Sequence, residues 1–437
     1  MTGAFQAAEH PEIGRKTLQI ISWRLLPLLS LSYFFCVIDR ANLSFAALTM
    51  NADLSFSPVT YAWGAGLFLI GYSLFEVPSN LLLVRLGSRL WIPRIIVTWG
   101  IVSCATALVS GATGFYLLRF LLGLAEAGFF PGVVFYLTFW YPPAYRARIL
   151  SAFILASPLS AVLGGSVSGF ILGLDGLSGL KGWQWLFILE GLPTIVLGLA
   201  SAFLLPDHPA TARWLNSEQK SWLERQLAND RLGKRGHRGR GLSVWPRSPA
   251  ILVSAVIYFG IVSTLYDIQF WLPQIVQGFG LTNMQVGFVS AFPFAVAAVA
   301  MILWGRHSDR GQERVLHVAL PLLISALSLF LLIYAETLVA AMALLTVATV
   351  GAYCAFGVFW TLSSTLFSAT ALPVAIAMIN SFSNIPSFGG IYLIGWLKQT
   401  TGAPLAGMVF LAVLPLLAGF LTLGVGFRIR MRTAAPH

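Results

Sequence analysis

Charged residues are scarce in this chain of 437 residues: 10% are Asp, Glu, Lys or Arg, whereas 57% are hydrophobic. Soluble domains contain about 25% charged and about 45–50% apolar residues, so the composition excludes an ordinary soluble domain. The three cysteines, Cys36, Cys104 and Cys354, lie in apolar runs and show neither a disulfide framework nor a metal-binding spacing. The chain also lacks a Gly-x-x-x-x-Gly-Lys-Ser/Thr phosphate loop and a His-Glu-x-x-His zinc motif. We therefore expect neither an ATP-driven pump nor an enzyme, and no metal or organic cofactor.

Long apolar runs are abundant instead. Each run has roughly 18 or more residues, which is enough for one membrane-spanning helix. Six are expected before a polar, basic segment and six after it: 22–46, 58–84, 92–111, 114–141, 147–173 and 183–205, then 249–275, 284–304, 315–335, 337–366, 371–397 and 403–427. This pattern predicts an all-α membrane protein with twelve transmembrane helices in two six-helix halves. The predicted divisions are an N-terminal segment 1–21, a bundle 22–205, a linker 206–248, a bundle 249–427 and a C-terminal segment 428–437.

The net charge of +11 would suggest nucleic acid as a partner if the basic residues were grouped on a soluble surface. They lie mostly in alternate loops, and the remaining loops receive only Lys181 and Lys398. The positive-inside rule then places both termini in the cytoplasm. We expect a multi-pass protein of the bacterial inner membrane whose basic loops face anionic lipid, with no nucleic-acid partner.

A basic turn containing glycine recurs after the second expected helix of each half. The first copy contains Arg85, Gly87 and Arg89, and the second contains Gly305, Asp309 and Arg310. This internal repeat indicates a pseudo-symmetric transporter, and we predict that the six residues form a conformational gate.

Two pairs of ionisable residues lie inside expected membrane helices. Arg119 and Glu126, seven residues apart, share one face of 114–141, and such groups usually face a bundle interior or a substrate or proton pathway. A static ion pair that orders the bundle is the alternative. Asp39 and Arg40 are adjacent near the end of 22–46. They either border the same cavity, or Arg40 extends to the outer lipid headgroups with Asp39 as its partner.

Other polar and aromatic side chains in the apolar runs could serve either helix packing or substrate binding. Asn380 and Asn384 share a helix face and either join helices or donate hydrogen bonds to a substrate. Tyr266 and Trp360 could stack on a substrate ring or bind its hydroxyl groups. Whether Glu76, Glu190 and Asp267 line the pathway stays open.

Several motifs taken together resemble the major facilitator superfamily and, within it, the anion:cation symporter family. They are Asp39-Arg-Ala-Asn42, Pro78-Ser-Asn-Leu-Leu-Leu, Arg119-Phe-Leu-Leu-Gly-Leu-Ala-Glu126-Ala-Gly-Phe-Phe-Pro131-Gly, Trp140-Tyr-Pro, Gly182-Trp-Gln-Trp, Phe270-Trp-Leu-Pro273 and Trp304-Gly-Arg-His-Ser-Asp309-Arg. The match covers nearly the whole chain. It is most similar to bacterial tartrate-type permeases, with phthalate, hydroxyphenylacetate and sugar-acid carriers as neighbours.

This resemblance implies proton-coupled uptake of an organic anion. Arg40 and Arg119 would hold the substrate carboxylate, Asp39 and Glu126 would carry protons, and Tyr72 and Asn384 would line the cavity. The sequence departs from the family pattern at Asn80 and Val84 in the first basic turn, at Ser383, Pro386, Ser387 and Ile391 near the eleventh expected helix, and at Asp267. These departures concern the gate and the identity of the substrate.

We hypothesise that protonation of Glu126 and Asp39 weakens their pairing with Arg40 and Arg119 and frees both arginines for the anion. Tartrate or a related hydroxy-dicarboxylate is the expected substrate, and we expect a functional monomer. The alternatives are aromatic acids, sugar acids, proton-coupled export of an amphiphilic compound, and a membrane sensor that transports nothing.

Overall fold

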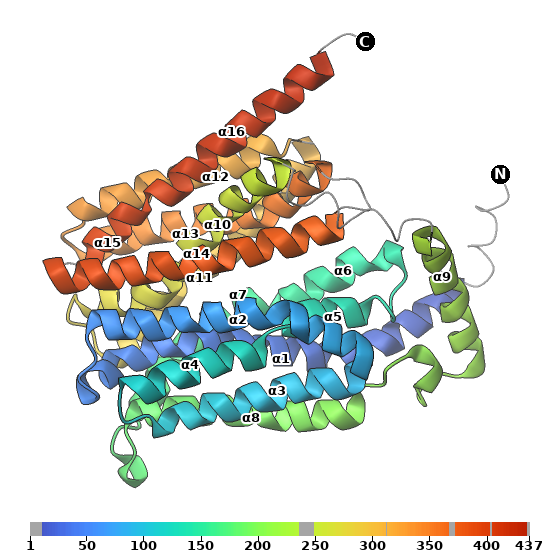
Figure 1. Ribbon diagram of the computed structural model, residues 1–437, viewed down its shortest axis with the longest axis horizontal. Coiled ribbons are helices and arrows are strands. Elements are labelled where there is room, and N and C mark those ends of the chain that lie inside the picture. Colours follow the sequence, from blue (N-terminus) through green and yellow to red (C-terminus); the bar gives the residue numbers. More distant parts are fainter. Residues whose placement is uncertain (1–10, 236–248, 312, 367–371, 403, 435–437) are drawn as a thin grey trace.

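The computed structural model describes residues 11–235, 249–311, 313–366, 372–402 and 404–434. These residues form helices and short turns, and no strand occurs among them. The all-helical class predicted from the sequence is confirmed. The helices of the first half lie together in the lower part of Figure 1, and those of the second half lie above them.

The helices of the first half are α1 (Pro11–Asp53), α2 (Pro58–Leu86), α3 (Ser88–Ala105), α4 (Ala112–Glu126), α5 (Phe129–Leu137), α6 (Pro143–Ile154), α7 (Ala156–Leu172) and α8 (Gly182–Leu204). Helix α1 is far longer than expected. Its 43 residues extend about 65 Å, whereas the hydrocarbon core of a bilayer is about 30 Å thick. The excess projects toward α9 (Ser217–Arg235), where Gly14 packs against the ring of Trp222.

The second half comprises α10 (Pro249–Gln277), α11 (Asn283–Gly311), α12 (Val315–Leu331), α13 (Leu338–Leu366), α14 (Leu372–Thr401), α15 (Pro404–Leu411) and α16 (Val413–Ala434). Within the described residues, eleven helical segments are long and apolar enough to cross a membrane. The eleventh expected segment, 371–397, corresponds to α14, which has 30 residues but falls outside that set. Its central stretch carries Asn380, Ser383, Asn384 and Ser387, and these polar side chains lower its hydropathy.

The expected helix 114–141 is interrupted immediately after Glu126. Ala127 leaves the helical conformation, and Gly128 adopts a φ of +86° before α5 begins. A Cβ atom at residue 128 would also collide with the side chain of Ser79 on α2. The break therefore requires glycine, and it leaves Glu126 as the last residue of α4.

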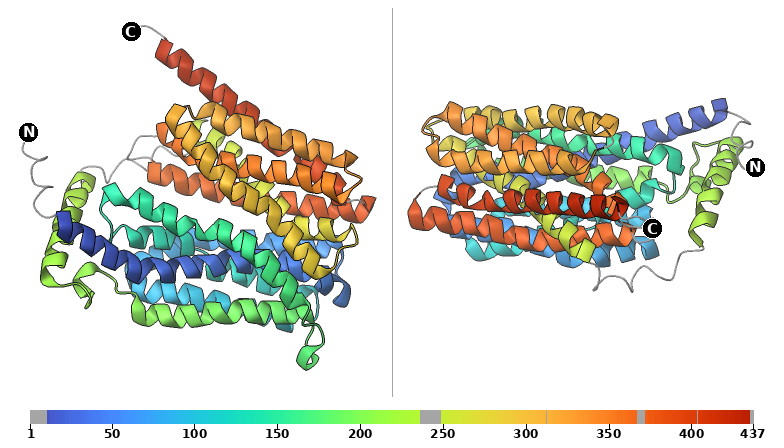
Figure 2. Two further views of the ribbon diagram at one scale, coloured as in Figure 1. Left: turned by 180° about the vertical axis from the view of Figure 1, so that it is seen from behind. Right: turned by 90° about the horizontal axis from the view of Figure 1, so that it is seen from above.

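In the described part of the chain, the main contacts between the two halves are those of α1 with α10, α2 with α14, and α7 with α11. Small residues bring α7 and α11 close, because Gly165 and Gly169 face the backbone around Gly287. The Gly165-x-x-x-Gly169 spacing thus permits close helix packing. Figure 2 shows the two halves lying along each other over their length.

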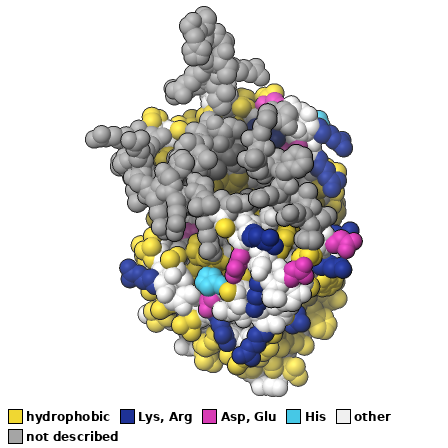
Figure 3. Space-filling model, turned by 90° about the vertical axis from the view of Figure 1, so that its right-hand side faces the viewer, with side chains coloured by type: hydrophobic (Ala, Val, Ile, Leu, Met, Phe, Trp, Pro, Cys, Tyr) yellow, Lys and Arg dark blue, Asp and Glu magenta, His cyan; other side chains and the backbone are white. Residues whose placement is uncertain are grey.

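Helix α9 lies across one end of the molecule, where the N-terminal part of α1 also emerges (Figures 1 and 2). Asn216 and Gln219 each accept a hydrogen bond from the other's backbone N–H group, which forms a capping box at the start of α9. Figure 3 shows this end, with lysine, arginine and acidic side chains spread across it.

Candidate functional site

Arg40 and Glu126 form an ion pair between α1 and α4. Two guanidinium nitrogens of Arg40, Nε and Nη2, contact Oε1 of Glu126. Cys36, one turn before Arg40, donates a longer bond of 3.1 Å to the same oxygen. The side chain of Glu126 is fully buried, whereas that of Arg40 is 20% exposed. Oε2 of Glu126 has no partner among the described residues.

Aromatic rings of α2 lie beside both arginines. The guanidinium carbon of Arg40 is 5.0 Å from the ring centre of Tyr72 and 5.4 Å from that of Phe68. The guanidinium carbon of Arg119 is 5.3 Å from the same Phe68 ring. The two cations therefore lie no farther apart than the sum of the two Phe68 distances, with a cation–π contact on each.

Arg119 is fully buried. None of its three guanidinium nitrogens has a hydrogen-bond partner among the residues that the structure describes. The alternative considered from the sequence, a static Arg119–Glu126 ion pair, is not formed, because Glu126 stands at the end of α4 and its carboxylate meets Arg40 of α1 instead. Arg119 is thus a buried cation with unused donors, which is costly unless an anion binds there.

Asp39 faces a different part of the first half. Its carboxylate accepts 2.8 Å bonds from the indole N–H of Trp99 and the hydroxyl of Ser103, both on α3, and a 3.1 Å bond from the hydroxyl of Thr194 on α8. Asn42 adds a longer contact of 3.4 Å. Asp39 does not pair with Arg119, so the predicted exchange among four charges reduces to the Arg40–Glu126 pair beside an unpaired Arg119. Adjacent helix residues point about 100° apart, which explains how Asp39 and Arg40 reach different neighbours.

Helix α2 carries contacts to the second half on either side of the arginine-facing rings. Near its start, the hydroxyl of Tyr61 donates a 2.9 Å bond to the carbonyl of Phe270 on α10. One turn beyond Tyr72, Glu76 Oε1 accepts a 3.0 Å bond from the amide of Asn380 on α14. The arginine pair therefore lies between two sets of contacts that join the halves.

The remaining predicted binding residues lie in the second half. Tyr266 on α10 packs against Phe270, with ring centres 6.4 Å apart. Trp360 on α13 packs against Tyr258, with ring centres 4.8 Å apart. Asn384 on α14 is 4% exposed. The structure thus brings Tyr72 to the charged pair, bonds Asn380 to Glu76, and places Trp360 in an aromatic cluster of its own half.

The two predicted gate loops lie at the α9 end. Arg85 and Arg89 are exposed, and Gly87 has a φ of +86°. The carboxylate of Asp207, which follows α8, accepts a 2.8 Å bond from the backbone N–H of Arg89 at the start of α3. An acid from the linker thus caps α3 beside the turn in which Val84 replaces the family's usual aspartate.

In the second gate loop, Asp309 pairs with Arg314 at 2.7 Å. Arg310 is exposed, and Gly305 lies within α11. The two loops therefore differ in how they use their carboxylates: Asp309 acts within its own turn, whereas the first turn uses Asp207 from outside.

Two other polar groups have structural partners. Glu190 on α8 accepts a 2.8 Å bond from Ser168 on α7, so it joins two helices of the first half.

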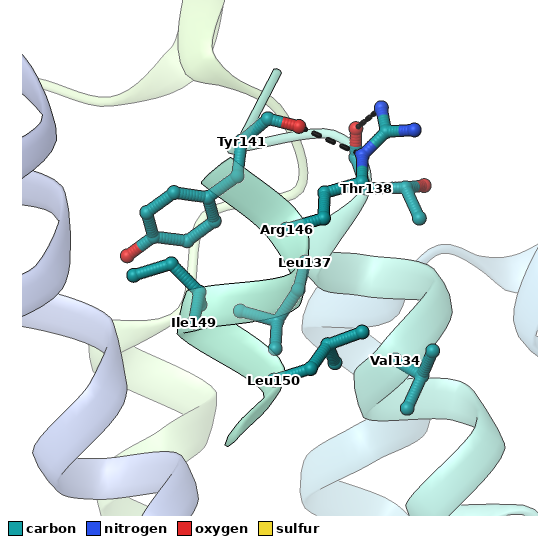
Figure 4. Close-up of a pocket in the computed structure, with 7 residues that line it drawn as sticks. All are labelled: Val134, Leu137, Thr138, Tyr141, Arg146, Ile149 and Leu150. Atoms are coloured by element: carbon teal, nitrogen blue, oxygen red, sulfur yellow. Dashed lines mark hydrogen bonds between the residues drawn. The ribbon is translucent and has the colours of Figure 1, made fainter. Parts of the chain in front are cut away.

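Figure 4 shows a small apolar hollow beyond α5, where the guanidinium of Arg146 donates hydrogen bonds to the carbonyls of Tyr141 and Thr138 at 2.8 and 3.0 Å. That arginine holds the turn between α5 and α6. No cluster of three or more His, Cys, Asp or Glu able to hold a metal occurs among the described residues.

Sequence reasoning missed the partners of the charged residues. Phe68 precedes Tyr72 by one helical turn, and Trp99 precedes Ser103 by one turn. The spacing i, i+4 places each pair on one helix face, and this was a usable signal. Nothing in the sequence indicated that Phe68 would face the arginines and that Trp99 would face Asp39.

Buried charges within two halves built of long apolar helices are typical of a membrane transporter. The family model for the Major Facilitator Superfamily matches residues 29–391, and the chain belongs to that superfamily, as the resemblance predicted. It is therefore a multi-pass membrane transporter and not an enzyme.

Curated relatives resemble the chain over nearly its full length. A protein of Agrobacterium vitis named "Putative tartrate transporter" is 43% identical over 412 residues, which cover 94% of this chain and 92% of that protein. A quinolone resistance transporter of Acinetobacter baumannii is 38% identical over 412 residues and 94% and 95% of the two chains.

Solved structures of the same fold are more distant in sequence. The inward-open xylose transporter XylE of Escherichia coli has a TM-score of 0.74 at 15% identity, over 92% of this chain and 95% of that one. A bacterial homologue of the human lysosomal transporter Spinster, inward-facing and occupied, has a TM-score of 0.73 at 18% identity, over 91% and 95%. These similarities concern the fold alone.

Proposed function

We propose that the protein is a proton-coupled symporter that takes up a small organic anion, with tartrate or a related hydroxy-dicarboxylate as the substrate. The observation that carries the proposal is Arg119, a fully buried guanidinium without a hydrogen-bond partner in the described residues. A guanidinium keeps its charge and matches a carboxylate with two parallel hydrogen bonds. The relatives named for tartrate support a dicarboxylate as the ligand.

Competition for Arg40 links the proton to the anion. In the empty site Glu126 occupies Arg40, so a second substrate carboxylate would have to displace an ion pair. A proton on Glu126 removes that competition and leaves Arg40 and Arg119 as two cations facing one dianion. The proton therefore binds Glu126 before, or together with, the second carboxylate.

Asp39 would act differently from Glu126 if it also takes up a proton. Its carboxylate accepts bonds from Trp99, Ser103 and Thr194. A proton there would weaken contacts among α1, α3 and α8 and leave the charge facing the substrate unchanged. We propose Asp39 as the group through which protonation alters helix packing.

Alternating access would occur around this site. Opening toward one side separates Tyr61 from Phe270, and opening toward the other separates Glu76 from Asn380. The basic loops and α9 would face the cytoplasm of a bacterial inner membrane, as would both termini. We propose a monomer that uses no cofactor besides the coupling proton and has no nucleic-acid partner.

Uptake of radioactive tartrate into proteoliposomes tests the proposal. An inward proton gradient should drive accumulation by the wild type. Glu126→Gln should abolish gradient-driven accumulation and retain tartrate counterflow, because glutamine resembles the protonated acid: it leaves Arg40 free for tartrate, but it can neither bind nor release a proton. Asp175→Asn, in the exposed turn before α8, is the matched control and should behave as wild type. Gradient-driven accumulation by Glu126→Gln at the wild-type level would contradict the proton role.

The substrate class has its own test. The melting temperature of purified protein is measured with tartrate, sugar acids and aromatic acids, once at a pH below 7 and once at a pH above 7. Stabilisation by a dicarboxylate is expected, and stabilisation by no carboxylate would contradict the anion site.

Export of an amphiphilic compound is a second candidate, favoured by the relative named as a quinolone resistance transporter. Proton-coupled export predicts that adding a fluoroquinolone to proton-loaded vesicles moves protons in the direction opposite to the drug. Tartrate-dependent proton movement in the same direction as tartrate would support symport instead.

A further inference from the structure

Asp267 lies inside the second half, at a place that corresponds to Asp39 in the first. Each aspartate is on the first helix of its half, α1 or α10, and each is more than halfway along that helix. Their surroundings are opposite. Asp39 accepts hydrogen bonds from two other helices, whereas neither oxygen of Asp267 has a hydrogen-bond partner in the part of the chain that the structure describes.

Asp267 belongs to a polar seam between the parallel helices α10 and α14. Along this seam Ser383 donates a 3.0 Å bond to the carbonyl of Ala255. The hydroxyls of Ser263 and Ser387 lie 2.9 Å apart. Farther along, Lys398 donates a 2.8 Å bond to Gln274. Asp267 stands between the last two contacts. Neither of its carboxylate oxygens has a hydrogen-bond partner among the described residues, whereas Gln274 lacks one only at Nε2.

The backbone of α14 closes over the carboxylate. A Cβ atom built on Gly390 would lie 3.0 and 3.1 Å from the two oxygens of Asp267. The residue is 2% exposed. Glycine at position 390 thus permits a close approach that leaves little space for an ion with its own ligand shell. A proton is the cation that such a site admits.

Among the described residues, no opposite charge forms an ion pair or hydrogen bond with Asp267. Helices α1, α11, α13, α14, α15 and α16 pack on α10, and Tyr61 of α2 also contacts it. Lys398 is engaged with Gln274 and with the ring of Trp271, and Arg40 is engaged with Glu126. The other titratable side chains described in the central parts of these helices are Tyr33, Cys36 and Asp39 on α1, Tyr61, Tyr72 and Glu76 on α2, Tyr258 and Tyr266 on α10, Tyr353 and Cys354 on α13, and Tyr392 on α14. None of them is hydrogen-bonded to Asp267.

We infer that Asp267 is a proton-binding site of the second half, occupied by a proton in the conformation seen here. A buried carboxylate without donors is strongly unfavourable when ionised, whereas the protonated acid is neutral. Release of this proton would require α14 to move away from α10 and admit water or a donor. The site therefore couples protonation to contacts within the second half, as Asp39 would do within the first. Its role in transport, but not its protonation, rests on the proposed function.

Infrared spectroscopy of the protein in lipid vesicles without substrate tests the inference directly. A protonated carboxyl absorbs through its C=O stretch, apart from ionised carboxylates. At neutral pH, Asp267→Asn should lose one such band, and Asp175→Asn, which alters an exposed acid, should keep it. A spectrum of Asp267→Asn with every wild-type band retained would overturn the inference. So would a band that disappears when sodium replaces choline, because sodium and not a proton would then occupy the site.

A second variant covers the case in which Asp267→Asn does not fold. Gly390→Ser places a hydroxyl beside the carboxyl and should shift the same band, and an unshifted band would count against the assignment. In transport, Asp267→Asn should retain tartrate counterflow and move one proton fewer per tartrate than the wild type. An unchanged ratio would refute the coupling role. Failure of the wild type to transport tartrate would refute the proposed substrate and leave the infrared result standing.

Discussion

Replacing Arg119 with methionine should stabilise the empty protein, although it should destroy the binding site. Methionine has a similar length and no charge, and Arg119 has no hydrogen-bond partner to lose among the described residues. The variant removes a buried charge whose solvation was lost on folding. Replacing buried ionic groups with hydrophobic residues can stabilise proteins by about 1–4 kcal/mol. We expect a gain in this range, reduced by the loss of the contact with Phe68, which is worth about 1 kcal/mol.

Arg40→Met should have the opposite effect. Arg40 also contacts an aromatic ring, but it neutralises Glu126, which is fully buried. Removing one partner of a buried ion pair costs about 3–5 kcal/mol. The lower end, about 3 kcal/mol, is expected because the Arg40 side chain is 20% exposed. Two arginines beside the same phenylalanine should thus respond to the same substitution with opposite signs.

Thermal unfolding in lipid nanodiscs, with and without tartrate, measures both effects. Arg119→Met should melt above the wild type without ligand and show no further rise with tartrate, whereas Arg40→Met should melt below the wild type. The reasoning would be refuted if Arg119→Met were as destabilising as Arg40→Met. Arg119 would then have a stabilising partner, and the observation that carries the anion site would be lost.

Two further predictions concern the scaffold. Gly128→Ala should lower the free energy of unfolding by at least about 1 kcal/mol, because a φ of +86° is unfavourable for alanine and its Cβ meets Ser79. The control Gly111→Ala, with open space around the added Cβ, should be close to neutral. Equal melting temperatures of the two variants would contradict this account. Partial burial pushes the pKa of Glu313 up, but hydrogen bonds from the Leu316 and His317 N–H groups and the His317 ring hold it below its ordinary value. Its stabilisation should be complete above about pH 4.3 and lost as the pH falls through the lower folded pKa, so Glu313→Gln should flatten the pH dependence of the melting temperature in that acidic range.

The sequence predicted the helical class and the two halves, because membrane helices depend on long apolar runs that are visible locally. It predicted that Arg119 and Glu126 would be buried, for the same reason. It could not predict that Glu126 would pair with Arg40. That pairing depends on the break after α4, which requires Gly128 to fit against Ser79 of α2. A contact between distant helices thus decides which ionisable groups meet, and spacing within one helix does not reveal it.

The departures from the family pattern have a similar explanation. From Val84 alone, the first gate turn lacks a carboxylate. The fold supplies one from elsewhere, because it places Asp207 at the adjacent end of α3. Ser383 and Ser387, two of the residues that depart from the family pattern, bond to α10. These substitutions strengthen contacts inside the second half and lie apart from Arg40 and Arg119. They therefore bear on the movement of α14 more directly than on the identity of the anion.

The charges at the site relate the substrate to the coupling proton. In the empty site Arg40 and Glu126 cancel, and Arg119 contributes one uncompensated positive charge. A monocarboxylate would neutralise Arg119 without disturbing the ion pair, so its binding would not require a proton on Glu126. A dicarboxylate brings a second negative charge that only Arg40 can balance, and Arg40 becomes available when Glu126 is protonated. The same three side chains would thus couple a dianion to a proton through Glu126 and leave a monoanion uncoupled at that residue. Under the proposed function, the dependence of transport on Glu126 therefore measures the charge of the natural substrate.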